Sequence, residues 1–113
     1  MRSPDPRAAG SPAFELDTIE ERIAVVRVVG ELDIGSADTL RSALDQAEAA
    51  GTAIIRLDAS QVAFLDSTAL GVILASAQRM AARNGRLELV CESPAMRRIL
   101  DLTMISRTVH LLP

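Results

Sequence analysis

The chain has 113 residues, of which 49% are hydrophobic, with two Phe and neither Trp nor Tyr. This length suffices for one domain with a core of its own but not for two. The shortage of aromatic rings and the formal net charge of −3 argue against a nucleic-acid-binding protein, which needs stacking platforms or a basic surface.

The N-terminal part is predicted to contain a leader and a hairpin. Residues 1–13 carry three prolines and no periodic apolar pattern, so we expect a disordered leader ahead of one domain over residues 14–113. A docking tail is the alternative interpretation of the leader. Residues 14–18 alternate apolar and polar side chains, as a half-buried strand does. After a turn, the β-branched run at residues 23–29 predicts a more central strand that pairs with the first.

A helix and a third strand are expected next. Ser36 is the predicted N-cap, with Asp38 in the first turn favouring the helix dipole, and Gly51 is expected to end the helix in the left-handed conformation. Residues 53–58 then predict a mostly apolar strand that ends at Asp58. The helical period separates an apolar inner stripe from charged outer positions: Ala37, Leu40, Leu44 and Ala47 against Arg41, Asp45 and Glu48.

Residues 62–71, VAFLDSTALG, are the central stretch of the chain. An apolar run stops at an acid and two hydroxyls, and a helical pattern over residues 66–84 begins at once. Asp66, Ser67 and Thr68 all suit an N-cap or a first turn, because their side chains can satisfy the free backbone N–H groups there. The same geometry puts a small hydroxyl at an exposed helix N-terminus, which suits a switch as well as a cap.

The period of this central helix predicts its buried face. Five residues are expected to be buried and four to lie opposite: Leu70, Ile73, Leu74, Ala77 and Ala81 against Val72, Ser76, Arg79 and Arg83. Between these two sets, Ser67, Gly71 and Ala75 form a line of small side chains. Two interpretations of that line stay open, namely close packing against a neighbouring element, or a flat surface on which a partner sits close to Ser67.

The C-terminal part is predicted to be a strand, a helix and a final strand. Asn84 and Gly85 close the central helix, and residues 86–91 and 108–112 have strand character. Ser93 and Pro94 start the intervening helix. Its inner face is expected to comprise Met96, Ile99, Leu100 and Thr103. The predicted fold is therefore α/β, with the order β-β-α-β-α-β-α-β and a mixed, largely parallel sheet of about four to five strands with three helices.

Groups that could carry catalysis are few. His110 lies in the last predicted strand without an oriented partner, and Cys91 and His110 lack the spacing of metal ligands. Neither a Walker pattern nor G-x-G-x-x-G occurs. We therefore expect no catalytic residue, no metal site and no cofactor, and a protein that is not an enzyme.

One set of acids could surround the central hydroxyls. In a parallel sheet, strand C-termini and helix N-termini gather at one edge, so Asp33, Asp58, Asp66 and Ser67 are predicted to share a rim. Solvated loop acids and helix caps are the alternative, and three carboxylates are weak evidence for Mg²⁺. A phosphoryl group on Ser67 would add about −1.5 to −2 charges beside a helix N-terminus that favours anions. Such a change suits a switch that a partner reads.

These motifs resemble those of a known family. Residues 62–71 resemble the phosphorylation motif of bacterial anti-sigma-factor antagonists, the STAS-domain family. The segment VGELD at residues 29–33, with the apolar helix positions that follow it, resembles the family's other marked segment. Residues 93–100 are similar to the start of its third helix. The resemblance covers roughly residues 14–112 in the same element order.

The resemblance implies a partner switch in transcription regulation. Dephosphorylated, the protein would bind an anti-sigma factor with serine kinase activity and free a sigma factor; phosphorylation of Ser67 would switch it off, and a serine phosphatase would reset it. The acceptor is the first hydroxyl after the acid, so Ser67 carries over and Thr68 does not. The predicted partner surface comprises Asp33, Asp66, Ser67, Thr68, Gly71 and Ala75.

Two departures from the family pattern are present. Ala69 stands where the motif commonly has Gly, which could stiffen the helix start or narrow the approach of a kinase. The sequence also stops after its last predicted strand, without the further helix of some members. A structural STAS subunit of a membrane transporter or of a regulatory scaffold is therefore kept as the alternative function, and a nucleotide-binding protein is disfavoured by the missing phosphate loop.

The expected compartment is the cytoplasm. A single cysteine, Cys91, excludes an internal disulfide. No apolar run approaches the roughly 20 residues of a membrane span, and the N-terminus lacks the apolar region of a signal peptide. We expect no direct membrane insertion.

Overall fold

The computed structural model describes residues 13–17, 23–32, 34–102 and 107–112. Its elements follow the predicted order: β1 (Ala13–Asp17), β2 (Ile23–Leu32), α1 (Ile34–Ala49), β3 (Ile54–Leu65), α2 (Ser67–Ala82), β4 (Arg86–Val90), α3 (Pro94–Leu102) and β5 (His110–Leu112). The α/β fold class is thus confirmed. Asp33, Thr103 and the predicted leader, apart from Ala13, lie outside the described residues.

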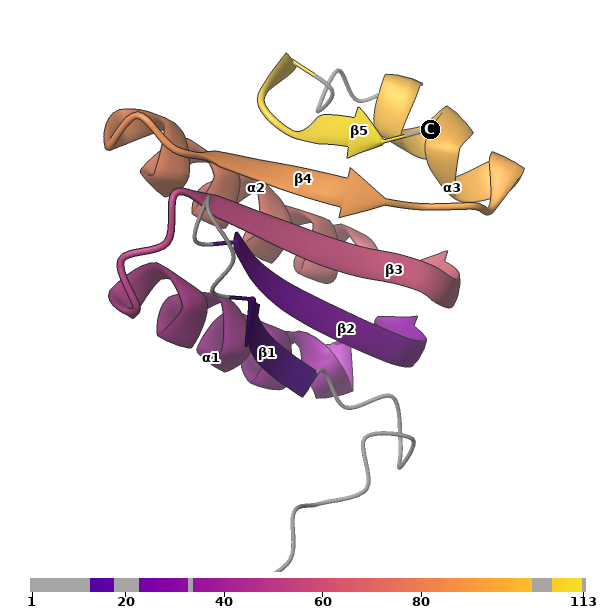
Figure 1. Cartoon of the computed structure of the whole chain (residues 1–113). Helices are drawn as coiled ribbons and strands as arrows, with labels where there is room; N and C mark the ends of the chain where they lie inside the picture. Colours follow the sequence, from indigo (N-terminus) through magenta and orange to yellow (C-terminus); the bar gives the residue numbers. More distant parts are fainter. Residues whose placement is uncertain (1–12, 18–22, 33, 103–106, 113) are drawn as a thin grey trace, which may run out of the picture.

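The strands form one mixed sheet in the order β1-β2-β3-β4-β5. β1 and β2 are antiparallel, which confirms the hairpin, and the other three pairs are parallel. Each parallel crossover moves to the next strand in the same direction, and right-handed crossovers then put their helices on the same face. Figure 1 shows α1 and α2 together behind the sheet. The two helices pack against each other as well as against the strands.

The core lies between the sheet and these helices. Alternate residues of the central strands and one face of each helix are buried, among them Val26, Ile55, Leu57, Leu87, Leu89, Leu40, Leu44, Ile73 and Met80. Burying one such aliphatic side chain contributes about 1.5–3 kcal/mol. The packing of α1 and α2 on the sheet is therefore the main stabilising interaction of the domain. The predicted inner stripe of α1, namely Ala37, Leu40, Leu44 and Ala47, is confirmed.

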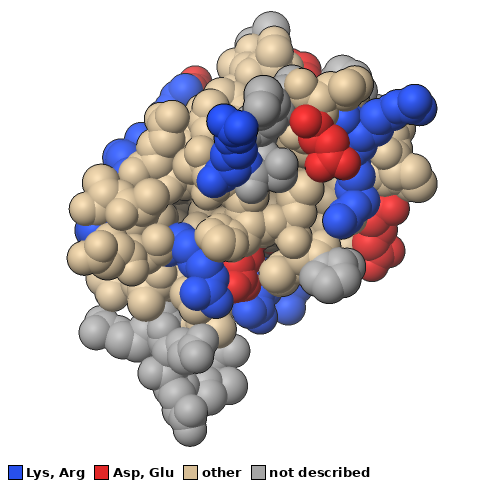
Figure 2. All heavy atoms as spheres, turned by 90° about the horizontal axis from the view of Figure 1, so that it is seen from above, with Lys and Arg blue, Asp and Glu red and all other residues tan. Residues whose placement is uncertain are grey.

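The opposite face of the sheet carries charged side chains. Glu88 is 4% exposed and accepts hydrogen bonds from Arg56 and Arg86 at 2.9 and 2.8 Å, and Arg27 lies 3.8 Å from Asp58. Burial by itself would raise the pKa of Glu88, but the hydrogen bonds and charges of the two arginines outweigh it and lower that pKa. Figure 2 views the molecule from a different side, the end at which β5 and α3 lie in Figure 1, and basic and acidic side chains are interspersed among uncharged ones there.

The third strand is longer than predicted. β3 continues through Asp58 to Leu65, so the prediction that the strand ends at Asp58 was wrong. Asp58 accepts hydrogen bonds from the backbone N–H and the hydroxyl of Ser60, which satisfies a polar side chain within a strand. The acid therefore marks the polar face of the sheet and not the end of the strand.

The first helix begins earlier than predicted. α1 starts at Ile34, so Ser36 lies inside the helix and Asp38 lies beyond its first turn. The predicted end is confirmed, because Gly51 follows the helix with φ of 74°.

The buried face of α2 is rotated from the predicted one. Ile73 and Ala77 are buried as expected, but Val72 and Ser76, predicted to lie opposite, are also buried, at 6% and 0% exposed. Leu70 and Leu74 are half-buried against the core, and Ala81 is exposed. The difference arises because α1 covers a second side of α2, which the period of α2 alone does not reveal.

The turns that follow α2 and β4 agree with the predicted helix end at Asn84 and Gly85 and the predicted helix start at Ser93 and Pro94. Asn84 adopts φ of 65° after α2, and a Cβ on Gly85 would meet the carbonyl oxygen of Ala53 at 2.6 Å. Ser93 caps α3 by accepting a hydrogen bond from the backbone N–H of Met96. Met96 and Leu100 are buried as predicted, whereas Ile99 is 44% exposed, so its placement on the inner face was wrong.

Candidate functional site

The start of α2 is fixed by an N-cap. Asp66 has extended backbone angles, and its carboxylate accepts a hydrogen bond of 2.9 Å from the backbone N–H of Ala69. Such a cap contributes about 1 kcal/mol. Ser67 is the first helical residue, and both Ser67 and Thr68 are exposed. The cap therefore holds two hydroxyls at the surface beside a helix N-terminus.

Ala69, the residue that departs from the family motif, lies on the inner side of the helix. It is fully buried within the core, and its N–H is the group that Asp66 caps. Its methyl group therefore packs inward and does not cover the exposed Ser67. The expectation that Ala69 could narrow the approach to the hydroxyl was wrong.

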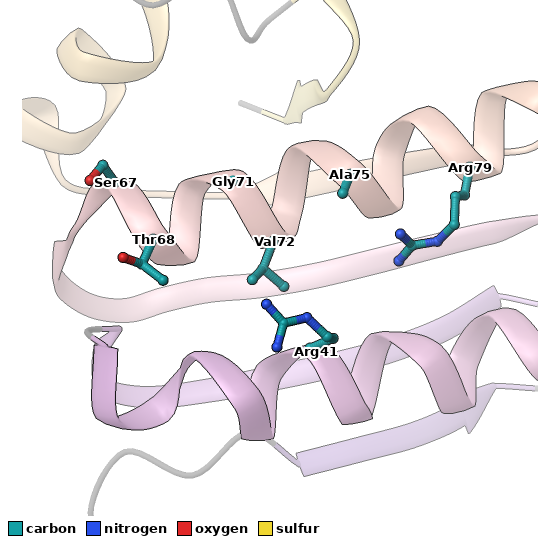
Figure 3. Close-up of a pocket in the computed structure, with 7 residues that line it drawn as sticks. All are labelled: Arg41, Ser67, Thr68, Gly71, Val72, Ala75 and Arg79. Atoms are coloured by element: carbon teal, nitrogen blue, oxygen red, sulfur yellow. The ribbon is translucent and has the colours of Figure 1, made fainter.

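A hollow of about 300 Å³, here called the α1–α2 hollow, adjoins these hydroxyls. It is lined by Arg41 from α1 and by six residues of α2: Ser67, Thr68, Gly71, Val72, Ala75 and Arg79. Figure 3 shows Arg41 reaching from α1 toward Val72, and Arg79 reaching from α2 toward α1. Thr68 lies on the side of α2 that faces α1. Four of the six predicted partner-binding residues thus line one surface feature.

The line of small residues borders open space. A Cβ built on Gly71 would meet no atom within 4 Å, and Gly71 is exposed, while Ala75 is half-buried. Close packing against a neighbouring element of this domain therefore does not explain Gly71. The interpretation of the line as an accessible surface fits the geometry.

A polar clamp joins α1 to α2 at one end of the hollow. Arg79 donates two hydrogen bonds to the carboxylate of Glu48, at 2.8 and 2.9 Å, and the hydroxyl of Ser76 donates a third at 2.7 Å. Arg83 donates to the backbone carbonyls of Glu48 and Thr52. Glu48, predicted to lie on the outer face of α1, is instead an interhelical residue. The clamp fixes the two helices relative to each other.

This clamp changes the acidity of Glu48. Burial alone would raise its pKa, but the hydrogen bonds from Arg79 and Ser76 and the positive charges of Arg79 and Arg83 outweigh burial. The pKa of Glu48 therefore lies below its ordinary value near 4.5. The carboxylate is held ionised, as its partners require.

The predicted rim of acids is only partly formed by the described residues. Asp66 lies beside Ser67, but Asp58 lies within β3, seven residues before the strand ends, on the face of the sheet that carries the ion pairs. Asp33 lies outside the described residues. The prediction that Asp58 joins Ser67 was wrong, because β3 does not stop at the acid.

Other candidate chemistry was also located. His110 is exposed in β5. Cys91 is buried, and burial raises the pKa of its thiol. Among the residues that the structure describes, no group of three or more His, Cys, Asp or Glu side chains could hold a metal ion, and no described helix is long and apolar enough to cross a membrane.

Two arginines of the hollow were missed as site residues. Arg41 and Arg79 were predicted to lie on the outer faces of two different helices, which is correct for each helix taken alone. Their meeting across one hollow depends on how α1 packs against α2. The nearest signal in the sequence is that each of the two helices carries a basic residue on its polar face.

Comparison with known proteins places this geometry in a family. The sequence model of the STAS domain family matches residues 16–113 of this chain. The chain belongs to the STAS domain family. This STAS domain is 29% identical to an anti-sigma F factor antagonist of Lysinibacillus sphaericus over 80% of this chain and 78% of the relative.

Solved structures give the same picture. The STAS domain superposes on an anti-sigma factor antagonist from Mycobacterium paratuberculosis with a TM-score of 0.78 and 29% identity, covering 94% of this chain and 89% of that one. It also matches the phosphorylated form of the Bacillus cell fate determinant SpoIIAA, with a TM-score of 0.67, 25% identity and coverage of 89% and 92%. The predicted family is confirmed.

Proposed function

We propose that this STAS domain is an anti-sigma-factor antagonist switched by phosphorylation of Ser67. Unphosphorylated, it binds an anti-sigma factor with serine kinase activity in the cytoplasm, and the sigma factor is released. Phosphorylated, it no longer binds. The observation that carries the proposal is the exposed hydroxyl of Ser67 at the start of α2, beside an accessible hollow, in a chain whose relatives are named anti-sigma factor antagonists.

The surroundings of Ser67 are compatible with a phosphoryl group. The residue is exposed, so added volume displaces no core atom. The N-terminus of α2 carries positive partial charge, which favours an anion by about 0.3–1 kcal/mol at a surface. We therefore expect the modified domain to keep its fold while its surface near the hollow gains about −1.5 to −2 charges.

The switch assigns the chemistry to the partner. The kinase transfers the γ-phosphoryl group of ATP to Oγ of Ser67: the new O–P bond forms, the bond to the leaving ADP breaks, and a base on the kinase takes the hydroxyl proton. A serine phosphatase then hydrolyses the ester. In this scheme the STAS domain is substrate and ligand, and contributes no catalytic residue.

Intact mass spectrometry tests the acceptor. The purified domain is incubated with ATP, Mg²⁺ and each candidate anti-sigma kinase of the source organism. We expect wild type and Thr68→Ala to gain the mass of one phosphoryl group, and Ser67→Ala to gain none. Thr68 is the matched control because it is also exposed and lies next in sequence.

Two outcomes would overturn the assignment. If Ser67→Ala is modified and Thr68→Ala is not, the acceptor is Thr68. If every variant stays unmodified by all candidate kinases, the switch is wrong and a structural STAS subunit of a transporter or scaffold becomes the better account.

A further inference from the structure

The side chains that line the α1–α2 hollow include several hydrogen-bond donors. Its two charged lining residues, Arg41 and Arg79, are both cationic, and Ser67 and Thr68 add hydroxyl groups. The remaining wall is small or apolar. Arg79 is already paired with Glu48 and Asp45, so Arg41 is the lining residue whose positive charge a further carboxylate could use.

The two arginines differ in how firmly they are held. Arg79 is bound at two nitrogen atoms by Glu48 and lies 3.5 Å from Asp45, so it forms a fixed wall. Arg41 is paired through one nitrogen to Asp38 at 2.6 Å, and the side chains of this pair are 51% and 93% exposed. Exposed ion pairs between neighbouring positions of a helix contribute little to stability. Arg41 can therefore exchange its partner at low cost.

We propose that the α1–α2 hollow receives an aspartate or glutamate side chain of the anti-sigma factor, and that Arg41 binds its carboxylate in place of Asp38. This inference rests on the proposed function. A guanidinium group can form two parallel hydrogen bonds to a carboxylate, and docking would exclude the water that weakens the present pair. The open space at Gly71 lets the incoming side chain approach the backbone of α2. Val72 provides an apolar contact for the methylene groups of that incoming aspartate or glutamate.

The inference also gives phosphorylation a physical route to its effect. Ser67 lines the same hollow as Arg41. A phosphoryl group on Ser67 would add about −1.5 to −2 charges at the edge of the hollow that the carboxylate enters. Like charges at an interface oppose association. Partner binding would therefore be lost without any change of fold.

Binding titrations of charge variants test the inference. The probe is the anti-sigma factor that phosphorylates Ser67, and its binding to the unphosphorylated 113-residue STAS domain is measured by calorimetry in the absence of ATP. We expect Arg41→Glu to weaken binding by about 30-fold or more, because it leaves a buried carboxylate unpaired. Arg41→Gln, which keeps the size and removes the charge, should weaken it less.

The matched control is Arg27→Glu. Arg27 is 52% exposed and also lies near an acid, Asp58, but on the other face of the sheet. The same change of charge there should alter affinity by no more than about 3-fold. Circular dichroism of each variant checks that the fold is retained.

A second variant should change the affinity for the anti-sigma factor in the opposite direction. Asp38→Asn removes the residue that competes for Arg41 and should tighten binding by about 2- to 5-fold. Asp101→Asn, which makes the same change at an exposed position of α3, controls for the general gain from removing a negative charge. In the partner, an Asp→Arg or Glu→Arg change that restores binding to Arg41→Glu would identify the incoming side chain.

The outcomes separate the inference from the proposed function. If Ser67→Asp abolishes binding while Arg41→Glu binds like wild type, the inference is wrong and the switch stands. If wild type is neither bound nor phosphorylated by any anti-sigma factor, the proposed function fails and the inference fails with it.

Discussion

Two glycines in and after α2 have opposite environments. Gly71 faces open space in the α1–α2 hollow, whereas a Cβ on Gly85 would meet the carbonyl oxygen of Ala53 at 2.6 Å and Cε of Met80 at 2.9 Å. Glycine inside a helix is less stable than alanine by roughly 0.5–1 kcal/mol. The absence of a side chain at Gly71 therefore costs stability and leaves this part of the hollow open.

Alanine at these two glycines should change stability in opposite directions. We predict that Gly71→Ala raises the free energy of unfolding by about 0.5–1 kcal/mol, and that Gly85→Ala lowers it by about 1–3 kcal/mol because the methyl group overlaps backbone. Urea unfolding followed by circular dichroism measures both. A loss of stability in Gly71→Ala would show that the small-residue line packs within the domain.

At the residue scale, much of the candidate site could be predicted. The acid-hydroxyl-hydroxyl sequence before an apolar helical pattern predicted where α2 begins, with Asp66, Ser67 and Thr68 as candidates for the cap or the first turn. The structure selects Asp66 as the cap and Ser67 as the first helical residue. Ala69 could not be judged in the same way. Whether its methyl group faces the hydroxyl or the core depends on the direction of α2 relative to the sheet, and the structure buries it.

At the element scale, the clamp between α1 and α2 makes stability depend on pH. The pKa of Glu48 is lowered in the folded state, so the unfolded chain binds a proton there more readily than the folded domain does. The stabilising contribution of Glu48 is therefore complete above its ordinary pKa near 4.5 and is lost as the pH falls through its lower, folded value. Glu88 acts in the same direction.

Replacing Glu48 should expose this dependence. We expect Glu48→Gln to be less stable than wild type at pH 7, and the difference to shrink as the pH is lowered below about 4.5. Denaturant unfolding at a series of pH values measures it. Glu92→Gln, at an exposed position after β4, is the control for loss of one negative charge, and a difference that stays constant with pH would argue against the clamp.

The elements themselves were largely predictable, but their contacts were not. The order of helices and strands follows from periodicity and turn residues, which are local signals. The face of α2 does not, because Val72 and Ser76 are buried by α1 and not by the sheet. Neither does the length of β3, since Asp58 could be read as a strand end until its hydrogen bonds to Ser60 showed how the strand accommodates it.

At the scale of the whole molecule, the topology leaves two distinct surfaces. One face of the sheet carries paired charges, and the other is covered by the helices whose outer sides form the α1–α2 hollow. Ser67, Gly71 and Ala75 could be placed on one line of α2 from its helical period alone, but whether that line packs or stays accessible could not be decided without the structure. The place of Arg41 beside them could not be predicted either, because it is a property of how α1 and α2 pack.

The central claim is that phosphorylation of Ser67 strongly weakens binding to an anti-sigma factor. Its most direct test is a calorimetric titration of the same anti-sigma factor with unphosphorylated domain and with domain that this kinase has phosphorylated stoichiometrically on Ser67. We predict that phosphorylation weakens binding by about 10-fold or more, since about −1.5 to −2 charges enter the proposed interface, and that Ser67→Asp weakens it in the same direction. Equal affinity of the two forms would contradict the account.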